Sequence, residues 1–301
     1  MSSKLNLKYD MAFKSVFGSG KKASQIALCS LLNSFLDQPV SSVQVINTEL
    51  TSEYLHQKRP RMDLLVELED GRLANIEMQI VHDKEELLYR MMYYLIRLSS
   101  RQRLKEGQPY SHLKNTYQIL IADFIVSEKL TRLIEQIEMR NDKGMDLGVA
   151  GKLMQMIIVQ LPKVPEIDSK EMSLAQKWGY FIKYFADEGK QAIIKEIIEE
   201  EEGIAMAEKM IEDMDQEWIE QLNKEFQQMR MEDIEREENA RIEQAEKRGK
   251  AEGLKQGLSQ GRAEGQRELI KTLAQSMTIE QISKVLQKNT EEIQRILENQ
   301  S

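Results

Sequence analysis

The chain has 301 residues, of which 41% are hydrophobic, 31% are charged and 6% are aromatic. This length allows one fair-sized core or two small domains, surrounded by a highly charged periphery. The formal net charge of -8 excludes a uniformly basic nucleic-acid binder, so any anion site has to be local. Residues 1–120 carry 16 basic and 13 acidic side chains, whereas the remainder carries 26 and 37, so the positive potential lies toward the N-terminus.

Several classes of site and segment are excluded by composition. The single cysteine, Cys29, excludes an intramolecular disulfide and a cysteine-rich metal site, and it favours a reducing, cytoplasmic setting. No run of about 18 apolar residues is present, and the N-terminus does not look like a signal peptide, so we expect no membrane insertion. His56, His82 and His112 lack metal-ligand spacing, and no motif indicates a small-molecule cofactor.

The first half of the chain alternates between helical and extended patterns. Apolar residues at helical spacing predict two helices within residues 9–36. β-Branched residues and alternation predict strands in 43–50 and 61–81, with a hairpin turn at Asp70 and Gly71. Residues 87–104 are helical in pattern, and 116–126 have the continuous apolar character of a buried strand. The predicted order is helix, strands, helix, strand.

The next segment, residues 133–163, predicts two more strands around a polar loop, after which Pro162 and Pro165 end the compact region. From about Ser173 the pattern is almost entirely helical, and residues 195–248 have the composition of long solvated helices. We therefore expect a core over 1–168, an acidic helical extension over 169–248, and a terminal part over 249–301.

Glycine recurs at every fourth position near the C-terminus, at Gly249, Gly253, Gly257, Gly261 and Gly265. Each glycine costs an isolated helix roughly 1 kcal/mol relative to alanine. The segment is therefore either a packed or self-associating helix, which would make a homo-oligomer, or a flexible linker. The last residues predict two short helices with Thr278 and Thr290 as their N-caps.

The hairpin within residues 61–81 determines its own register. Leu64, Val66 and Leu68 on one strand and Ala74, Ile76, Met78 and Ile80 on the other must share the buried face. A two-residue turn would mix the two faces, whereas a bulged or three-residue turn puts Leu64 opposite Ile76 and Asp63 opposite Glu77. We therefore predict a bulged or three-residue turn, with Asp63, Glu67, Glu69, Asn75, Glu77 and Gln79 on the other face.

This register brings Asp63 and Glu77 to within about 5 Å at Cβ, with Gln79 one step along the same face. Two carboxylates at that distance repel unless a cation neutralises them. Mg²⁺ prefers oxygen ligands, and in such a site it polarises a phosphodiester and activates a water. The alternative is that these acids belong to a solvated face of the sheet.

Several motifs together carry a resemblance to a known family. They are YDMAFKSVFG, RMDLLVELEDG, NIEMQ, LLYRMMYYLIRL, the later QLPK, the glycine-rich segment and MTIEQISKVL. In their order and spacing the chain resembles the PD-(D/E)XK nuclease family transposases, also called recombination-promoting (Rpn) nucleases. The resemblance implies a mixed α/β fold with a restriction-endonuclease-like αβββαβ core and a largely helical C-terminal extension. It also implies cleavage of DNA with a divalent metal, Mg²⁺ or Mn²⁺.

The resemblance assigns the catalytic motif residue by residue. Asp63 matches the first acid, although Met62 stands where the family name has proline. Glu77 matches the second acid, and Met78 is the residue whose backbone carbonyl joins the metal shell. Gln79 stands in the lysine position, where glutamine is typical of the family that the chain resembles. An amide can orient a water by hydrogen bonding but cannot stabilise charge as lysine does.

Further residues are candidates for the metal shell and for DNA. Asp10 matches an acid of the first helix and either completes the metal shell through a water or caps that helix. Arg90 is either a phosphate clamp or an ordinary exposed helix arginine. Lys58, Arg59 and Arg61 precede the first acid and either contact the DNA backbone or form a basic turn without that role.

The leading hypothesis is a metal-dependent DNA endonuclease that acts in recombination or in the mobility of genetic elements. Because Gln79 replaces the lysine, the alternative is a catalytically weak or inactive nuclease-fold module that binds DNA or protein partners. A third interpretation is that the acidic extension shields the basic face of the core from DNA.

Overall fold

The computed structural model describes residues 4–46, 63–80 and 86–298. The chain divides into two compact units, Met1–Arg230 and Met231–Ser301, and we describe each by itself. Within the described residues, no helix is both long enough and apolar enough to cross a membrane.

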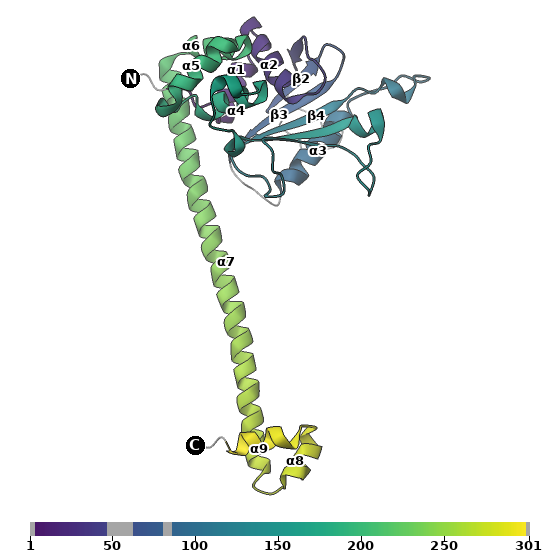
Figure 1. Ribbon diagram of the computed structural model, residues 1–301, viewed down its shortest axis with the longest axis vertical. Helices are drawn as coiled ribbons and strands as arrows, with labels where there is room; N and C mark the ends of the chain where they lie inside the picture. The colour runs from purple at the N-terminus through teal and green to yellow at the C-terminus, as the bar shows by residue number, and fades with distance from the viewer. Residues whose placement is uncertain (1–3, 47–62, 81–85, 299–301) are drawn as a thin grey trace, which may run out of the picture. The chain divides into compact units, whose positions relative to one another are not determined.

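A six-stranded mixed sheet forms the centre of the first unit (Figure 1). Its strands are β1 (Val43–Val45), β2 (Leu64–Leu68), β3 (Leu73–Gln79), β4 (Thr116–Ala122), β5 (Ile134–Ile137) and β6 (Met154–Gln160), in the spatial order β1-β2-β3-β4-β6-β5. β3, β4 and β6 run parallel, and the other neighbouring pairs are antiparallel. Every residue of β4 is buried, as the continuous apolar run predicted. The predicted order of elements and the mixed α/β class are confirmed.

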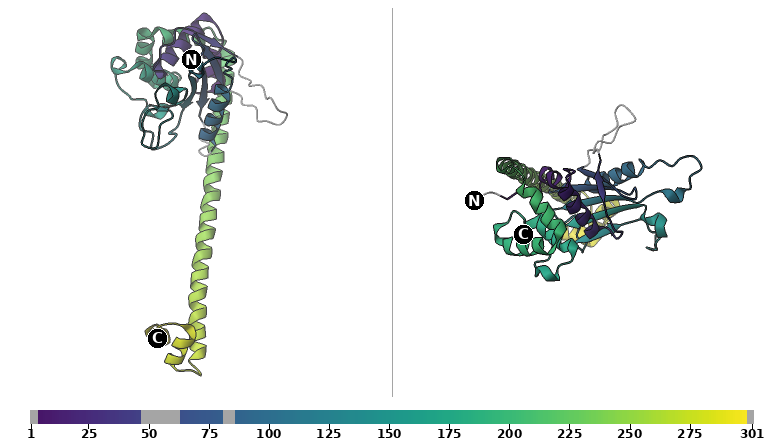
Figure 2. Two further views of the ribbon diagram at one scale, coloured as in Figure 1. Left: turned by 90° about the vertical axis from the view of Figure 1, so that its right-hand side faces the viewer. Right: turned by 90° about the horizontal axis from the view of Figure 1, so that it is seen from above.

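Helices cover both faces of the sheet (Figures 1 and 2). One face shares a single hydrophobic core with α1 (Asp10–Phe17), α2 (Lys22–Phe35), α4 (Leu174–Tyr184), α5 (Gln191–Glu200) and α6 (Glu202–Glu212). The other face is covered by α3 (Leu87–Ser99), through two smaller clusters. Short 3₁₀ turns lie at Tyr110–His112, Gly148–Lys152, Leu161–Lys163, Ser169–Glu171 and Glu188–Lys190.

The helices after residue 173 are part of this core. Ser173 opens α4 with a capping box, and Trp178 in that helix is fully buried. Ile197, Ile204 and Ile211 of α5 and α6 are also buried in the main cluster. A protein that lacks these helices would therefore lose part of its core, and the two compact units divide after Arg230. The predicted boundaries at residues 168 and 248 stay predictions.

The β2–β3 hairpin has the predicted register. Leu64 pairs with Ile76, so Asp63, one residue before the strand, lies opposite Glu77. The Leu68 amide donates to the carbonyl of Arg72 at 2.9 Å, which closes a three-residue loop. Gly71 in that loop has a φ of 85°, the left-handed conformation in which glycine meets no Cβ penalty.

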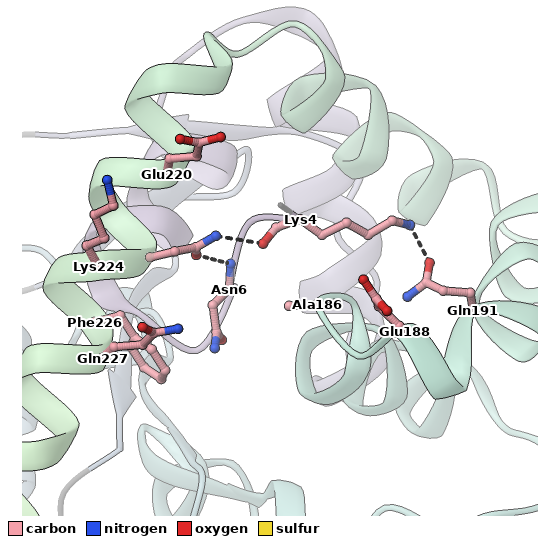
Figure 3. Close-up of a pocket in the computed structure, with 10 residues that line it drawn as sticks. Lys4, Asn6, Ala186, Glu188, Gln191, Glu220, Lys224, Phe226 and Gln227 are labelled. Atoms are coloured by element: carbon pink, nitrogen blue, oxygen red, sulfur yellow. Dashed lines mark hydrogen bonds between the residues drawn. The ribbon is translucent and has the colours of Figure 1, made fainter. Parts of the chain in front are cut away.

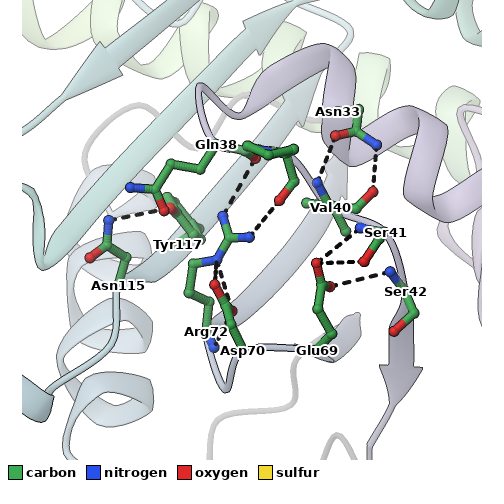
Figure 4. A network of polar contacts seen from close by, with 11 residues as sticks. Asn33, Gln38, Val40, Ser41, Ser42, Glu69, Asp70, Arg72, Asn115 and Tyr117 are labelled. Carbon is green, nitrogen blue, oxygen red and sulfur yellow. Dashed lines mark hydrogen bonds and ion pairs between the residues drawn. The ribbon is translucent and has the colours of Figure 1, made fainter.

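Polar contacts hold the hairpin loop against the segment before β1 (Figure 4). Arg72 is 4% exposed, and it donates to both carboxylate oxygens of Asp70 and to the carbonyl of Pro39 at 2.7 Å. The carboxylate of Glu69 accepts the backbone amides of Ser41 and Ser42, and these hydrogen bonds lower the pKa of Glu69 to about 2. The loop is therefore anchored on both sides.

The second unit contains most of α7 (Gln216–Leu273), together with α8 (Ile279–Leu286) and α9 (Thr290–Glu298). Ile270, Ile282 and Ile293 form its small core. The five regularly spaced glycines lie inside α7, so the segment is a helix rather than a flexible linker, and a Cβ added at any of them would meet nothing within 4 Å. Whether this helix makes a homo-oligomer stays a prediction.

One of the two N-caps predicted for the last two helices is confirmed and the other is wrong. Thr278 caps α8 with a capping box, as predicted. Thr290 as the cap of α9 is wrong by one residue, because Thr290 is already helical and the side-chain oxygen of Asn289 accepts from the amide of Glu291 at 3.2 Å. Asparagine caps as well as threonine does, so the pattern allowed either residue.

Gly71→Ala is expected to lower the free energy of unfolding by about 1–2 kcal/mol, because alanine is strained in the left-handed region. Space is available for the methyl group, since the nearest atom is 3.8 Å away on Lys114. Chemical denaturation of both proteins measures the difference. Gly71→Asn is the control and should cost less, because asparagine tolerates this conformation. Equal losses in the two variants would contradict the assignment of strain.

Candidate active site

Asp63 and Glu77 meet on the sheet face that α3 covers. The Asp63 amide donates to Oε1 of Glu77 at 3.1 Å, and Oδ2 of Asp63 accepts the Met78 amide at 3.2 Å. Glu77 is only 3% exposed, and Asn75 on the same face is fully buried. The alternative of a solvated face is therefore wrong for Asn75 and Glu77, although Glu67 in β2 is exposed.

Lys14 reaches this pair from α1. Its Nζ lies 3.0 Å from Oδ1 of Asp63 and 3.6 Å from Oδ2 of Asp10. The side chain of Lys14 remains 35% exposed. Tyr9 is the N-cap residue of α1 and Asp10 is its first helical residue, so the capping interpretation of Asp10 is wrong. Lys14 thus bridges the two aspartates.

Buried amides hold Glu77 from the interior of the sheet. Nδ2 of Asn75 donates to Oε1 of Glu77 and to Oε1 of Gln118, both at 2.9 Å. Gln118 is the partner of Asn75 across the parallel β3–β4 pair, and its Nε2 contacts the sulfur of Met91 on α3 at 3.3 Å. These contacts fix the Glu77 carboxylate in a defined orientation.

Burial dominates the electrostatics of the two acids. Burial, followed by the nearby charge of Asp63, raises the pKa of Glu77 to about 8. Burial also raises the pKa of Asp63, although Lys14 acts in the opposite direction. For Lys14, burial lowers the pKa, but the charge of Asp63 and its hydrogen bond outweigh this, so the net shift is upward. The pair therefore resists holding two negative charges.

The remaining predicted site residues are Met78, Gln79, Arg90 and the basic residues before Asp63. Met78 and Gln79 follow Glu77 in β3; Met78 is buried in the main core and Gln79 is half-buried. Arg90 on α3 is close enough for its charge to lower the pKa of Glu77, and its Nε is buried without a hydrogen-bond partner in the part of the chain that the structure describes. Lys58, Arg59 and Arg61 lie outside the described residues.

The residues around Asp63 and Glu77 fit a divalent cation. Two close carboxylates in a buried setting are hard oxygen donors, and Mg²⁺ is commonly bound by one or two carboxylates with waters completing its shell. The described residues contain no group of three acidic, histidine or cysteine side chains able to hold a metal, and a place for Asp10 in the metal shell through a water stays a prediction. Asp63, Glu77 and the Met78 carbonyl would hold the ion.

Lys14 and Gln118 belong to the site but were missed by sequence reasoning. Gln118 had a detectable signal, since it is a single amide in the otherwise apolar run of β4. Lys14 had a weaker signal: it lies four residues after Asp10, so both side chains occupy one side of the helix. Only the tertiary packing of α1 shows that this side approaches Asp63.

The first unit also has a cavity that neither Asp63 nor Glu77 lines (Figure 3). It has a volume of about 620 Å³ and is lined by residues from the N-terminal segment, α5 and α7, among them Lys4, Asn6, Gln191 and Asn223. Asn223 bonds to the carbonyl of Lys4 at 2.8 Å and to the amide of Asn6 at 3.0 Å. Among the residues that the structure describes, none of the predicted site residues lines this cavity.

Comparison with known proteins identifies the family. A sequence model described as PD-(D/E)XK nuclease family transposase matches residues 7–247, which include both acids, Lys14 and the whole sheet. Neither the search of curated proteins nor the search of solved structures found a match. The chain belongs to the PD-(D/E)XK nuclease family transposases.

Glu77→Gln is expected to stabilise the metal-free protein at high pH. The pKa of Glu77 is about 8 in the folded protein and 4.5 when unperturbed, so the stability of wild type falls as pH rises through this interval. The glutamine variant lacks this loss and should exceed wild type by on the order of 3–5 kcal/mol at pH 8, with little difference at pH 4. Denaturant unfolding in EDTA measures both, and an equal pH dependence in the two proteins would contradict the burial of an ionisable Glu77.

Proposed function

We propose that the protein is a divalent-metal-dependent DNA endonuclease that hydrolyses phosphodiester bonds. The observation that carries this proposal is the contact of Asp63 with the buried Glu77, because carboxylates on a solvated face of the sheet would not be buried together. Membership of a nuclease family supports DNA as the substrate. Mg²⁺ or Mn²⁺ is the proposed ion.

Each residue of the site has a separate task in this proposal. Asp63 and Glu77 hold the ion, and the hydrogen bonds from Asn75 and Met78 keep the two carboxylates oriented. A bound divalent ion polarises a phosphodiester and lowers the pKa of a water. Gln79 orients a water by hydrogen bonding, and Arg90 contacts a phosphate next to the scissile one.

We propose a role in recombination or in the mobility of genetic elements, and the transposase description of the family supports it. The competing function is a nuclease-fold module that binds DNA or a protein partner without cutting. Gln79 favours this second function, because the family name has lysine at that position.

Purified protein is expected to convert supercoiled plasmid to nicked or linear DNA in Mg²⁺ or Mn²⁺, and not in EDTA. Asp63→Asn and Glu77→Gln should each lower the rate by about 10³-fold or more, because each removes a ligand charge of the ion. Glu67→Gln is the matched control: Glu67 also lies on the hairpin but is exposed, so cutting should be unchanged. DNA binding without cutting by wild type in any metal would instead support the non-catalytic module.

Arg90→Met is expected to weaken DNA binding to a similar extent for all sequences and to lower the salt slope by about one charge. Fluorescence anisotropy with Asp63→Asn as background avoids cleavage during the titration. Arg132→Met is the control, because Arg132 is paired with Glu135 at 2.7 Å and is 71% exposed. If both arginine variants bind as their parent does, Arg90 is not a phosphate contact.

A further inference from the structure

The site has a mismatch of charge along β3. The sequence Glu77-Met78-Gln79 places a neutral amide where the family motif has lysine. An amide cannot supply a positive charge to a phosphate on which negative charge develops. Positive charge beside that phosphate therefore has to come from the metal ion or from a cationic side chain of another element.

Lys14 is placed to supply that charge. Its Nζ lies 3.0 Å from Asp63, and its side chain is partly open to solvent. Phe13, Val16 and Phe17 of the same helix are fully buried, so the position of α1 in the core is fixed by packing. The reach of Lys14 to Asp63 is therefore built into the fold.

The other basic side chains near the sheet contact residues other than Asp63. Lys8 is paired with Asp123 at 3.0 Å, and Arg72 is buried in the hairpin loop. Arg90, on α3, lies close enough to Glu77 for its charge to lower the pKa of that carboxyl. Lys14 is the cation in direct contact with Asp63 among the described residues.

We propose, on the basis of the nuclease function above, that Lys14 is the catalytic lysine of this site, supplied from α1 in place of the side chain at position 79. Its ammonium group contacts a nonbridging oxygen of the scissile phosphate and stabilises the charge that develops there during hydrolysis. The bond broken and the water consumed are those of ordinary phosphodiester hydrolysis, so no co-reactant is added.

A merely structural Lys14 would behave differently. If Lys14 only neutralised Asp63 in the metal-free protein, a divalent ion would take over that task, and cutting at saturating metal would not need the lysine. In both roles, removing Lys14 takes a positive charge from beside a metal ligand, so metal binding should be at least as tight. The two roles therefore differ in the cleavage rate at saturating metal.

The test compares Lys14→Met, Lys14→Met/Gln79→Lys and wild type in single-turnover cleavage of plasmid at saturating Mg²⁺. Lys14→Met is expected to lower the rate by about 100-fold, the usual effect of removing one group that stabilises transition-state charge. The double variant should recover about 10-fold or more, because it returns a lysine to β3. Lys190→Met is the control, since Lys190 pairs with the remote Glu166 at 2.7 Å.

A Mn²⁺ titration by calorimetry, without DNA, shows whether the lost rate is a loss of metal. The proposal expects Lys14→Met to bind Mn²⁺ at least as tightly as wild type. Wild-type cutting by Lys14→Met at saturating metal, or loss of Mn²⁺ binding in that variant, overturns the role of Lys14 and leaves the nuclease function standing. A wild type that binds Mn²⁺ but never cuts overturns the nuclease function itself, and the role of Lys14 with it.

Discussion

The pairing of Leu64 with Ile76 is the constraint on which the rest of the site depends. A shift of one residue would send every side chain of one strand to the other face, so Asp63 and Glu77 would no longer meet. The three-residue loop with Gly71 sets this pairing, and the buried Arg72 anchors the loop to the segment before β1. The turn at one end of the hairpin thus determines whether Asp63 and Glu77 lie opposite each other at the other end.

Burial of two carboxylates works against folding and in favour of metal binding. Taken from water, Glu77 prefers to remain protonated, which is why its pKa rises to about 8. A divalent cation would offset this repulsion, and in the proposed function it would bind where the two carboxylates meet. Lys14 offsets part of it already, through its contact with Asp63. Carboxylates whose pKa is raised by burial and by a nearby like charge cluster at functional sites.

Local patterns predicted the hairpin well, because its register follows from alternation and from the Asp70-Gly71 turn, both of which are visible in about twenty residues. The contact of Lys14 with Asp63 joins positions 49 residues apart and depends on how α1 packs, which no local pattern contains. Burial of Glu77 was missed for the same reason: a strand shows which residues share a face, not whether α3 covers it. The main hydrophobic core also contains buried residues of α4, α5 and α6, and the pattern of charged residues along these helices does not show which core they join.

The central claim is that Asp63 and Glu77 together hold one divalent ion. The most direct test is the anomalous scattering of Mn²⁺ in crystals of the wild-type protein. The account predicts a single peak bonded to one oxygen from each carboxylate at about 2.1 Å, the distance of a hard divalent ion. Well-ordered Asp63 and Glu77 with no anomalous peak between them at saturating Mn²⁺ would contradict it.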